Sequence, residues 1–190
     1  PLSVQSVCDA VIDIMRVAAE EKNISLSLTN ETHISAFAGD PLRIKQVLLN
    51  LVGNAIKFTP DHGEVGLEVC EGETPGTIAF RIWDTGPGVS SLHADTIFKS
   101  FVQADGDVVS TQPGTGLGLT IARHLTRLHG GDISLERMDG PGAVFTVNLP
   151  IGDPICAPAI AGAGADLVHT DSAQVADTES ATDEVERDIE

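Results

Sequence analysis

The chain has 190 residues, a formal net charge of -17 and a hydrophobic fraction of 42%. This length suits one domain with its own apolar core, and the negative charge disfavours nucleic acid and anionic lipid as partners. No apolar run approaches the roughly 20 residues of a membrane-spanning helix, and the first residues carry no signal-peptide pattern. Cys8, Cys70 and Cys156 lack metal-ligand or redox spacing, so we expect reduced thiols in a cytoplasmic protein.

Hydrophobic periodicity predicts alternating helices and strands over the first part of the chain. Apolar residues at helical spacing predict a first helix over residues 4–21, and alternation predicts a strand over 24–30. Asp40 followed by Pro41 is typical of a helix start. We expect this second helix to run to about Phe58.

Two strands are predicted next, over residues 64–71 and 77–84, joined by a turn that contains glycine and proline. A long irregular stretch over 85–114 follows them. A third helix is expected over roughly 115–129, where a glycine pair ends it. The last predicted strands cover 132–137 and 143–150.

The composition changes after residue 150. Residues 151–190 contain ten acidic residues and one arginine, without phenylalanine, tyrosine or tryptophan. Such a segment cannot bury enough apolar surface to offset its chain entropy. The sequence therefore predicts one folded domain over 1–150 and an acidic, disordered linker or tail over 151–190, with a short docking helix near its end as the alternative.

The second predicted helix carries an unusual polar face. Asn50, Asn54 and Lys57 fall within roughly 60° of one another on a helical wheel. Asparagine is a poor helix former, so Glu and Lys would serve a merely solvated face better. Amide oxygens suit a hard divalent cation such as Mg²⁺, and the lysine can pair with phosphate. This face predicts a metal and phosphate site, with a solvated surface as the alternative. The opposite face consists of Ile44, Val47, Leu48, Leu51, Val52 and Ala55.

The motif DTGPGV at residues 84–89 directly follows a predicted strand. It can be a simple tight turn, because aspartate, glycine and proline are common in turns. It can also place Asp84 as a hydrogen-bond acceptor at the bottom of a pocket, where glycines let the backbone approach a flat ligand. The motif alone does not decide between these two interpretations.

Three glycines, Gly114, Gly116 and Gly118, open the third predicted helix. Backbone N–H groups at a helix N-terminus bind anions, and missing side chains let a phosphate come close. The pattern is neither the dinucleotide fingerprint nor the Walker motif, because it lacks the preceding strand and the Gly-Lys-Ser/Thr that these require. His124 and His129 lie five residues apart, which does not suit a shared metal, so we interpret them as surface or helix-end residues.

The stretch before these glycines suits a lid over a nucleotide. Phe98 and Phe101 are three residues apart and can pack together, and a polar, glycine-bearing segment follows them. Long loops without regular structure are uncommon in a compact domain unless they cover a site or are disordered. A nucleotide lid is therefore the interpretation that this stretch favours.

In this order and spacing, the motifs resemble the ATP-binding catalytic domain of the sensor histidine kinases, in the superfamily that includes gyrase and the heat-shock chaperones. NLVGNAIKF resembles the N box, DTGPGV the first glycine box, IFKSF the phenylalanine box and GTGLGL the second glycine box. The matches cover roughly residues 40–150. The resemblance implies a two-layer α/β sandwich of the Bergerat type, a mixed sheet of about five strands with about three helices on one face.

The resemblance assigns a role to each motif. It implies that Asp84 binds the adenine amino group, that Asn54 coordinates Mg²⁺ and that Asn50 holds the metal and phosphate arrangement. Lys57 would contact phosphate, so that Asn50 and Lys57 are the implied catalytic residues. The remaining positions implied to shape the ATP pocket, its lid and its phosphate site are Gly86, Gly88, Phe98, Phe101, Gly114, Thr115, Gly116, Leu117 and Gly118.

The resemblance also implies an activity. Asn50 stands where the hydrolysing relatives carry a glutamate that activates water, and an amide cannot accept that proton at neutral pH. This favours a kinase that donates the γ-phosphoryl group of ATP to a histidine on a dimerisation hairpin, for relay to a response regulator or receiver domain. None of the six histidines lies in such a hairpin, so we expect the hairpin to precede residue 1.

The implied partners are ATP, the phosphoacceptor hairpin and a response regulator. We expect no nucleic acid partner, no direct membrane contact and a monomeric chain, because the hairpin normally supplies the dimer contact. Two alternatives remain open. One is a serine kinase of the anti-sigma type. The other is a degenerate domain that only binds partners, motivated by the absence of a basic residue over 102–113, where many relatives carry an arginine.

Overall fold

The computed structural model describes residues 1–89, 97–98, 117–137 and 141–152. All of them lie in the first of the two units into which the chain divides, Pro1–Ala159. The predicted tail over 151–190 falls almost entirely outside the described residues, so the domain boundary at residue 150 stays a prediction.

A five-stranded mixed sheet forms one layer of the fold. Its strand order is β2-β4-β5-β7-β6, in which β2 and β4 are parallel and every other neighbouring pair is antiparallel. A separate two-stranded sheet joins β1 (Leu2–Ser3) to β3 (Ala36–Phe37). The five strands are β2 Ser25–Asn30, β4 Glu64–Glu71, β5 Thr77–Asp84, β6 Asp132–Arg137 and β7 Ala143–Pro150.

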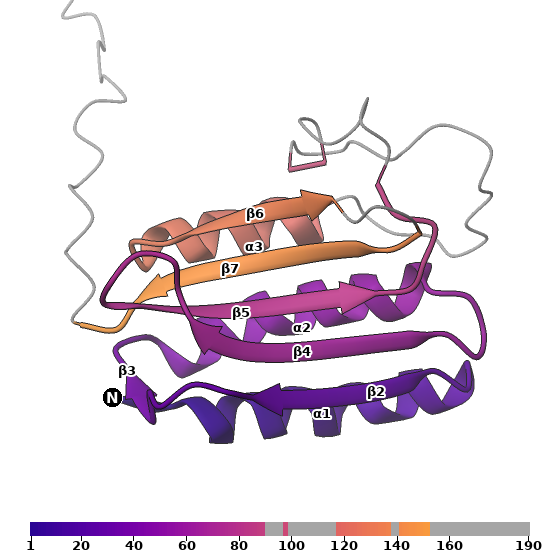
Figure 1. Cartoon of the computed structure of the whole chain (residues 1–190), viewed down its shortest axis with the longest axis horizontal. Coiled ribbons are helices and arrows are strands. Elements are labelled where there is room, and N and C mark those ends of the chain that lie inside the picture. Colours follow the sequence, from indigo (N-terminus) through magenta and orange to yellow (C-terminus); the bar gives the residue numbers. More distant parts are fainter. Residues whose placement is uncertain (90–96, 99–116, 138–140, 153–190) are drawn as a thin grey trace, which may run out of the picture. The chain divides into compact units, whose positions relative to one another are not determined.

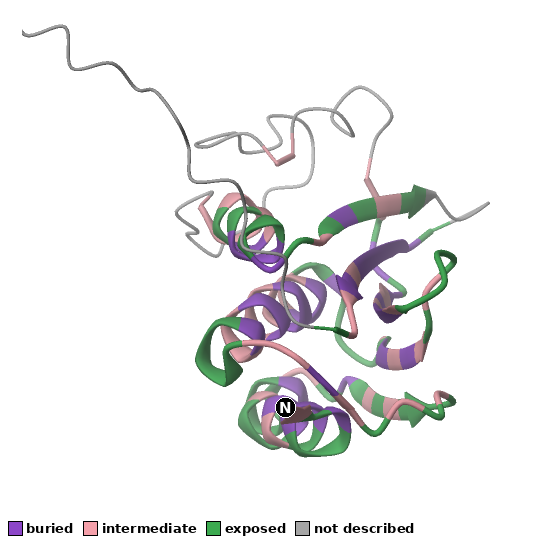
Figure 2. Cartoon of the chain, turned by 90° about the vertical axis from the view of Figure 1, so that its left-hand side faces the viewer, coloured by how far each residue is buried: buried purple, intermediate pink, exposed green. Residues whose placement is uncertain are grey.

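Three helices form the second layer and cover one face of this sheet (Figures 1 and 2). They are α1 Val4–Glu21, α2 Pro41–Phe58 and α3 Gly118–Leu128. The predicted two-layer α/β sandwich is thereby confirmed. The third helix begins at Gly118 among the described residues, whereas the sequence predicted a start near Thr115, which lies outside them.

The apolar face predicted for α2 packs against the sheet. Its six apolar residues are all buried, and burying each valine, leucine or isoleucine among them stabilises the fold by about 1.5–3 kcal/mol. The Asp40 carboxylate accepts hydrogen bonds from the N–H groups of Leu42 and Arg43, and Pro41 occupies the first helical turn, as predicted. Because the apolar face is buried, the asparagine face of α2 is turned away from the sheet.

The two histidines of α3 differ in environment. His124 is exposed, whereas His129 is only 9% exposed at the end of the helix. Its Nε2 accepts a hydrogen bond from the N–H of Asp40 at 3.2 Å, and its Nδ1 lies 2.8 Å from the carbonyl oxygen of Leu125. His129 is therefore a helix-end residue, as interpreted, but it joins the end of α3 to the start of α2 rather than facing solvent.

Within the described ranges, no helix combines the length and the apolar character that crossing a bilayer requires.

Candidate functional site

The asparagine face of α2 meets the beginning of α3. The Nδ2 of Asn50 donates a hydrogen bond to the carbonyl oxygen of Gly118 at 3.2 Å. A Cβ atom placed on Gly118 would lie 3.9 Å from Nδ2 of Asn54 and 4.0 Å from Cγ of Asn50. The fold thus brings both predicted asparagines and the last glycine of the second glycine box to one place.

Within the described part of the chain, no side chain caps the N-terminus of α3. Leu117 occupies the cap position, its side chain accepts no hydrogen bond, and the first intrahelical bond runs from the N–H of Ile121 to its carbonyl. The first N–H groups of a helix have no intrahelical acceptor, and the helix dipole adds a partial positive charge there. The start of α3 can therefore bind an anion beside the two asparagine amides.

Asp84 ends the strand β5 and is 6% exposed. Its Oδ1 accepts a hydrogen bond from the N–H of Gly86 at 2.8 Å. Burial raises the pKa of the Asp84 carboxyl, and the N–H groups of Gly86 and Ala143 partly oppose that rise. The structure therefore holds one buried carboxylate in a fixed direction at the end of the sheet, where it can accept a hydrogen bond from a ligand.

The two glycines after Asp84 are required by packing. A Cβ atom on Gly86 would lie 2.8 Å from Oδ1 of Asp84 and 3.1 Å from the carbonyl oxygen of Phe58. Gly88 has a φ of +78°, and its Cβ would lie 2.7 Å from the carbonyl oxygen of Gly142. Both contacts need glycine in the absence of any ligand. The approach to a flat ligand that the sequence indicated stays a prediction.

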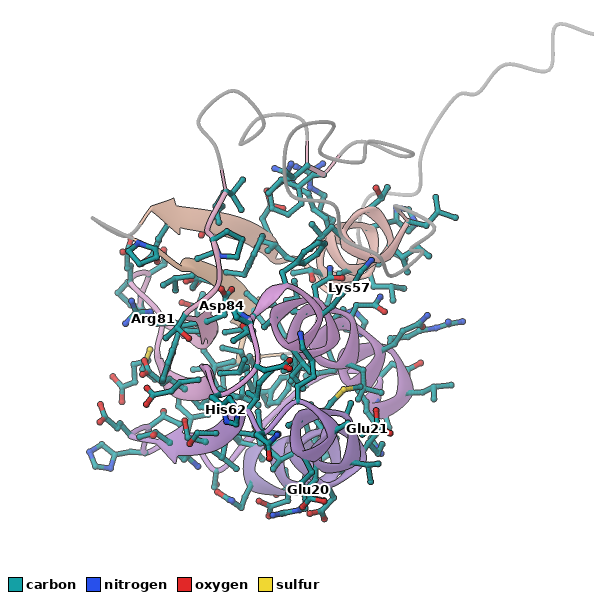
Figure 3. The ribbon with its side chains drawn as sticks, turned by 90° about the vertical axis from the view of Figure 1, so that its right-hand side faces the viewer. Glu20, Glu21, Lys57, His62, Arg81 and Asp84 are labelled. Atoms are coloured by element: carbon teal, nitrogen blue, oxygen red, sulfur yellow. The ribbon has the colours of Figure 1, made fainter. Side chains whose placement is uncertain are left out.

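Lys57 lies in the last turn of α2, at the same end of the sandwich as Asp84 (Figure 3). Its Nζ is 5.1 Å from the centroid of the Phe58 ring, which is a weak cation–π contact for a half-buried lysine. The ammonium and the buried carboxylate thus come from the ends of a helix and a strand that are 27 residues apart in sequence.

Phe98 packs against α3 and β7. Its carbonyl accepts a hydrogen bond from Oγ1 of Thr120 at 3.2 Å, and its ring meets the Phe145 ring edge-on at 6.3 Å between centroids. The guanidinium carbon of Arg123 lies 4.7 Å from the Phe98 ring centroid. The other predicted lid and phosphate positions, Phe101, Gly114, Thr115 and Gly116, lie outside the described residues.

Sequence analysis did not identify Arg123. Together with Arg127, one helical turn later, it forms hydrogen-bonded ion pairs with the Asp132 carboxylate at the start of β6. These partners hold the pKa of Asp132 below its ordinary value, although its partial burial acts in the opposite direction. A signal for these ion pairs was present in the sequence. Two arginines lie one helical turn apart, and an aspartate follows them directly after a glycine pair.

A cavity of about 420 Å³ lies beside α3 and β6, and none of its described lining residues belongs to α2. Phe98, Arg123 and Leu135 line it, and among the ATP-pocket residues that the structure describes only Phe98 contributes. Across the described ranges, no group of three or more His, Cys, Asp or Glu side chains gathers to hold a metal.

Comparison with known proteins shows the family to which the chain belongs. Residues 39–153 match the family of histidine kinase-, DNA gyrase B- and HSP90-like ATPases. The chain is 37% identical over 154 residues to the sensor protein GacS of Pseudomonas syringae pv. syringae, a match that covers 80% of this chain and 17% of GacS.

Solved structures show the same fold. Full-length ShkA, in complex with AMPPNP, aligns with a TM-score of 0.70 and 33% identity, over 84% of this chain and 32% of ShkA. The catalytic domain of histidine kinase ThkA aligns with a TM-score of 0.68 and 27% identity, over 80% of this chain and 96% of that domain. ThkA in complex with the response regulator protein TrrA aligns at 0.65 and 25% identity, over 79% of this chain and 41% of ThkA.

The chain thus spans less than a fifth of the length of GacS and about a third of ShkA. The family match over residues 39–153 contains α2, α3, the strands β4 to β7 and the spaced motifs described above. On this evidence the chain belongs to the family of histidine kinase-, DNA gyrase B- and HSP90-like ATPases, with the Bergerat fold of histidine kinase catalytic domains.

Proposed function

We propose that this chain is the Mg·ATP-binding catalytic domain of a two-component sensor histidine kinase. It donates the γ-phosphoryl group of ATP to a histidine on a dimerisation hairpin, for relay to a response regulator. The observation that carries the proposal is the meeting of Asn50, Asn54 and the uncapped start of α3 at Gly118. The AMPPNP complex of the related ShkA supports a nucleotide as the ligand.

Asp84 recognises the adenine ring in this proposal. Its buried carboxylate already accepts from Gly86 on Oδ1, which leaves further acceptor positions for an exocyclic amino group. Guanine presents a carbonyl oxygen at the matching ring position, and two acceptors facing one another in a buried site repel. The site therefore prefers ATP to GTP.

Asn50 and Asn54 are the residues that fit Mg²⁺. The Asn50 amide nitrogen is engaged by Gly118, so its oxygen remains to face a cation, and amide oxygens are hard ligands. Few protein ligands suffice for Mg²⁺, which keeps waters and binds the phosphates of its nucleotide. When bound, the cation neutralises phosphate charge.

The remaining groups position the phosphates. The first N–H groups of α3 face the anion, and the Lys57 ammonium adds a positive charge from the end of α2. Asn50 cannot take a proton from water, so the site orients the γ-phosphoryl group without activating hydrolysis. The phosphoryl acceptor is then a histidine supplied by the hairpin.

Neither alternative function is favoured. A partner-binding domain without catalysis would have no need for the two asparagines that flank Gly118, for Lys57 or for the buried Asp84. The serine kinase alternative gains no support from relatives that are sensor and histidine kinases. The TrrA complex of ThkA supports a response regulator as the partner downstream. In the same proposal the chain acts in the cytoplasm and is monomeric without the hairpin.

A transfer assay tests this function. The chain is incubated with γ-labelled ATP, Mg²⁺ and the dimerisation hairpin of a related sensor kinase, beside a hairpin whose phosphoacceptor histidine is replaced by glutamine. We expect acid-labile label on the intact hairpin only, and its loss in the Asn54→Ala chain. Acid-stable label on a serine would support the anti-sigma type of kinase. Nucleotide binding without any transfer would contradict the proposal.

A further inference from the structure

Lys22 makes an unusual contact between two helices. It is the residue that follows α1, and its Nζ reaches the last turn of α2, more than thirty residues away in sequence. There it donates hydrogen bonds to the carbonyl oxygens of Ile56 at 2.8 Å, Lys57 at 3.0 Å and Thr59. An ammonium group has three N–H donors and no acceptor, so this one turn satisfies all of them.

The end of α2 needs such a partner. The last carbonyls of a helix have no intrahelical donor, and the helix dipole makes that end negative. The Thr59 N–H and hydroxyl both bond to the carbonyl of Ala55, which leaves the carbonyls of the following residues for Lys22. A lysine cation satisfies several helix-end carbonyls at one point, which few side chains can do.

The backbone reinforces this contact. The N–H of His62 donates to the carbonyl oxygen of Lys22 at 3.0 Å, and the N–H of Ser25 donates to that of Gly63 at 2.9 Å. The turn after α1 and the connection after α2 are therefore joined through backbone as well as through the ammonium. Removing the Lys22 ammonium would leave these backbone bonds in place and affect mainly the last turn of α2.

That last turn forms one wall of the Asp84 loop. The carbonyl oxygen of Phe58 lies 3.1 Å from the position of a Cβ on Gly86, whose N–H bonds to Asp84. The same turn carries Lys57, and Gly63 just beyond it packs against Thr85, with a Cβ position 2.9 Å from its Oγ1. If the last turn of α2 moved, both Lys57, the lysine proposed to face phosphate, and the loop that holds Asp84 would shift with it.

We infer that Lys22 is a positioning residue for the nucleotide site. It touches no nucleotide, but it fixes the last turn of α2, and through that turn the direction of Lys57 and the wall behind Asp84. This inference rests on the proposed nucleotide-binding function. If Lys22 only capped a helix, its removal would lower the stability of the protein and leave the nucleotide affinity of the folded protein unaltered. A positioning residue would change both.

The test compares Lys22→Met with two matched controls. Lys45→Met removes the same charge from α2 itself, at a lysine that makes no side-chain hydrogen bond or ion pair among the described residues. Val11→Ala removes a buried contact on α1, away from the site, and lowers stability. Mg·ATP affinity is measured by calorimetry at a temperature where circular dichroism shows every variant folded. Lys22→Gln replaces the methionine variant if the latter does not fold.

We expect Lys22→Met to weaken Mg·ATP binding about fivefold or more, since three charge-assisted hydrogen bonds are lost together. Both control variants should bind like the wild type. Amide hydrogen exchange at Phe58 and Thr59 should accelerate in Lys22→Met and stay unchanged in Lys45→Met. Faster exchange and a lower melting temperature with wild-type affinity would overturn the inference. A wild-type chain that binds no nucleotide would instead overturn the proposed function on which it rests.

Discussion

At the scale of single residues, the site depends on small side chains and on buried polar atoms. Asp84 is 6% exposed, so its carboxylate acts in a low-dielectric setting where one hydrogen bond discriminates strongly between ligands. Gly118, at the start of α3, lies beside the amides of Asn50 and Asn54. A Cβ atom placed on it would be at ordinary contact distance from both amides. A substitution at Asp84 tests the charge of the site, and a substitution at Gly118 tests the space beside the two amides.

Gly118→Ala should separate stability from binding. A Cβ at this position meets Asn54 and Asn50 at 3.9 and 4.0 Å, which is ordinary van der Waals contact, so folding is not impaired. Alanine is also the better helix former, by up to about 1 kcal/mol. The added methyl group nevertheless occupies the space proposed for phosphate. We expect a melting temperature equal to or above that of the wild type, with ATP affinity reduced.

The control for this prediction is Gly88→Ala, because Gly88 has a φ of +78° and its Cβ would lie 2.7 Å from a carbonyl oxygen. That variant should lose stability by about 2 kcal/mol or more, in contrast to Gly118→Ala. Thermal unfolding and calorimetric titration of both variants make the comparison. A Gly118→Ala chain with wild-type affinity would show that phosphate lies elsewhere.

At the scale of elements, α3 is joined to the edge strand β6 by ion pairs. Arg123 and Arg127 share the Asp132 carboxylate, and Arg123 also lies over the Phe98 ring. The helix thereby connects the sheet to the one phenylalanine of the predicted lid that the structure describes. Because half of the Asp132 side chain is exposed, solvent screens these pairs and their contribution to stability is modest.

The Asp132 pair makes stability depend on pH in a defined direction. The folded-state pKa of Asp132 is lowered, so its contribution is present above the unfolded-state pKa and is lost as pH falls through the folded-state pKa. Asp132→Asn should therefore be less stable than the wild type near neutral pH, with the difference shrinking in strong acid. Urea unfolding at several pH values measures this, with Asp13→Asn on α1 as the control. A difference that does not change with pH would contradict the ion-pair explanation.

Elements and their boundaries were largely predictable from the sequence. Helices α1 and α2 and strands β4, β5, β6 and β7 have the predicted bounds, because each combines a clear apolar period with a cap or a turn signal. The buried face of α2 followed from the same periodicity, and so did the position of Asp84 at a strand end. These features depend on neighbours within one turn or one strand.

The features that the sequence did not reveal depend on distant partners. The sequence pattern drew no attention to Lys22, whose carbonyl partners lie 34 to 37 residues away. His129 was interpreted as a surface or helix-end residue, but the sequence did not reveal that it accepts a hydrogen bond from Asp40, 89 residues away. Propensity and periodicity do not report which helix ends meet in the folded chain. Such contacts become visible only when the sheet order is known.

At the scale of the whole molecule, we propose that Asn50, Asn54, Lys57 and Asp84 form one nucleotide site. The fold brings α2, α3 and the end of β5 together, and the family match covers residues 39–153. Lys22, which follows α1 and lies outside that range, is inferred to position the last turn of α2. The domain would then serve as the ATP-binding part of a longer kinase, to which the hairpin and the regulator are added.

The most direct measurement is a calorimetric titration of the chain with ATP, with and without Mg²⁺, beside Asp84→Asn and Asn54→Ala. We predict saturable binding by the wild type and loss of binding in Asp84→Asn, because an amide lacks the charge and the second acceptor oxygen of the carboxylate. Asn54→Ala should weaken only the binding that depends on Mg²⁺. A folded wild-type chain that binds no ATP at millimolar concentration, or an Asp84→Asn chain with wild-type affinity, would contradict the account.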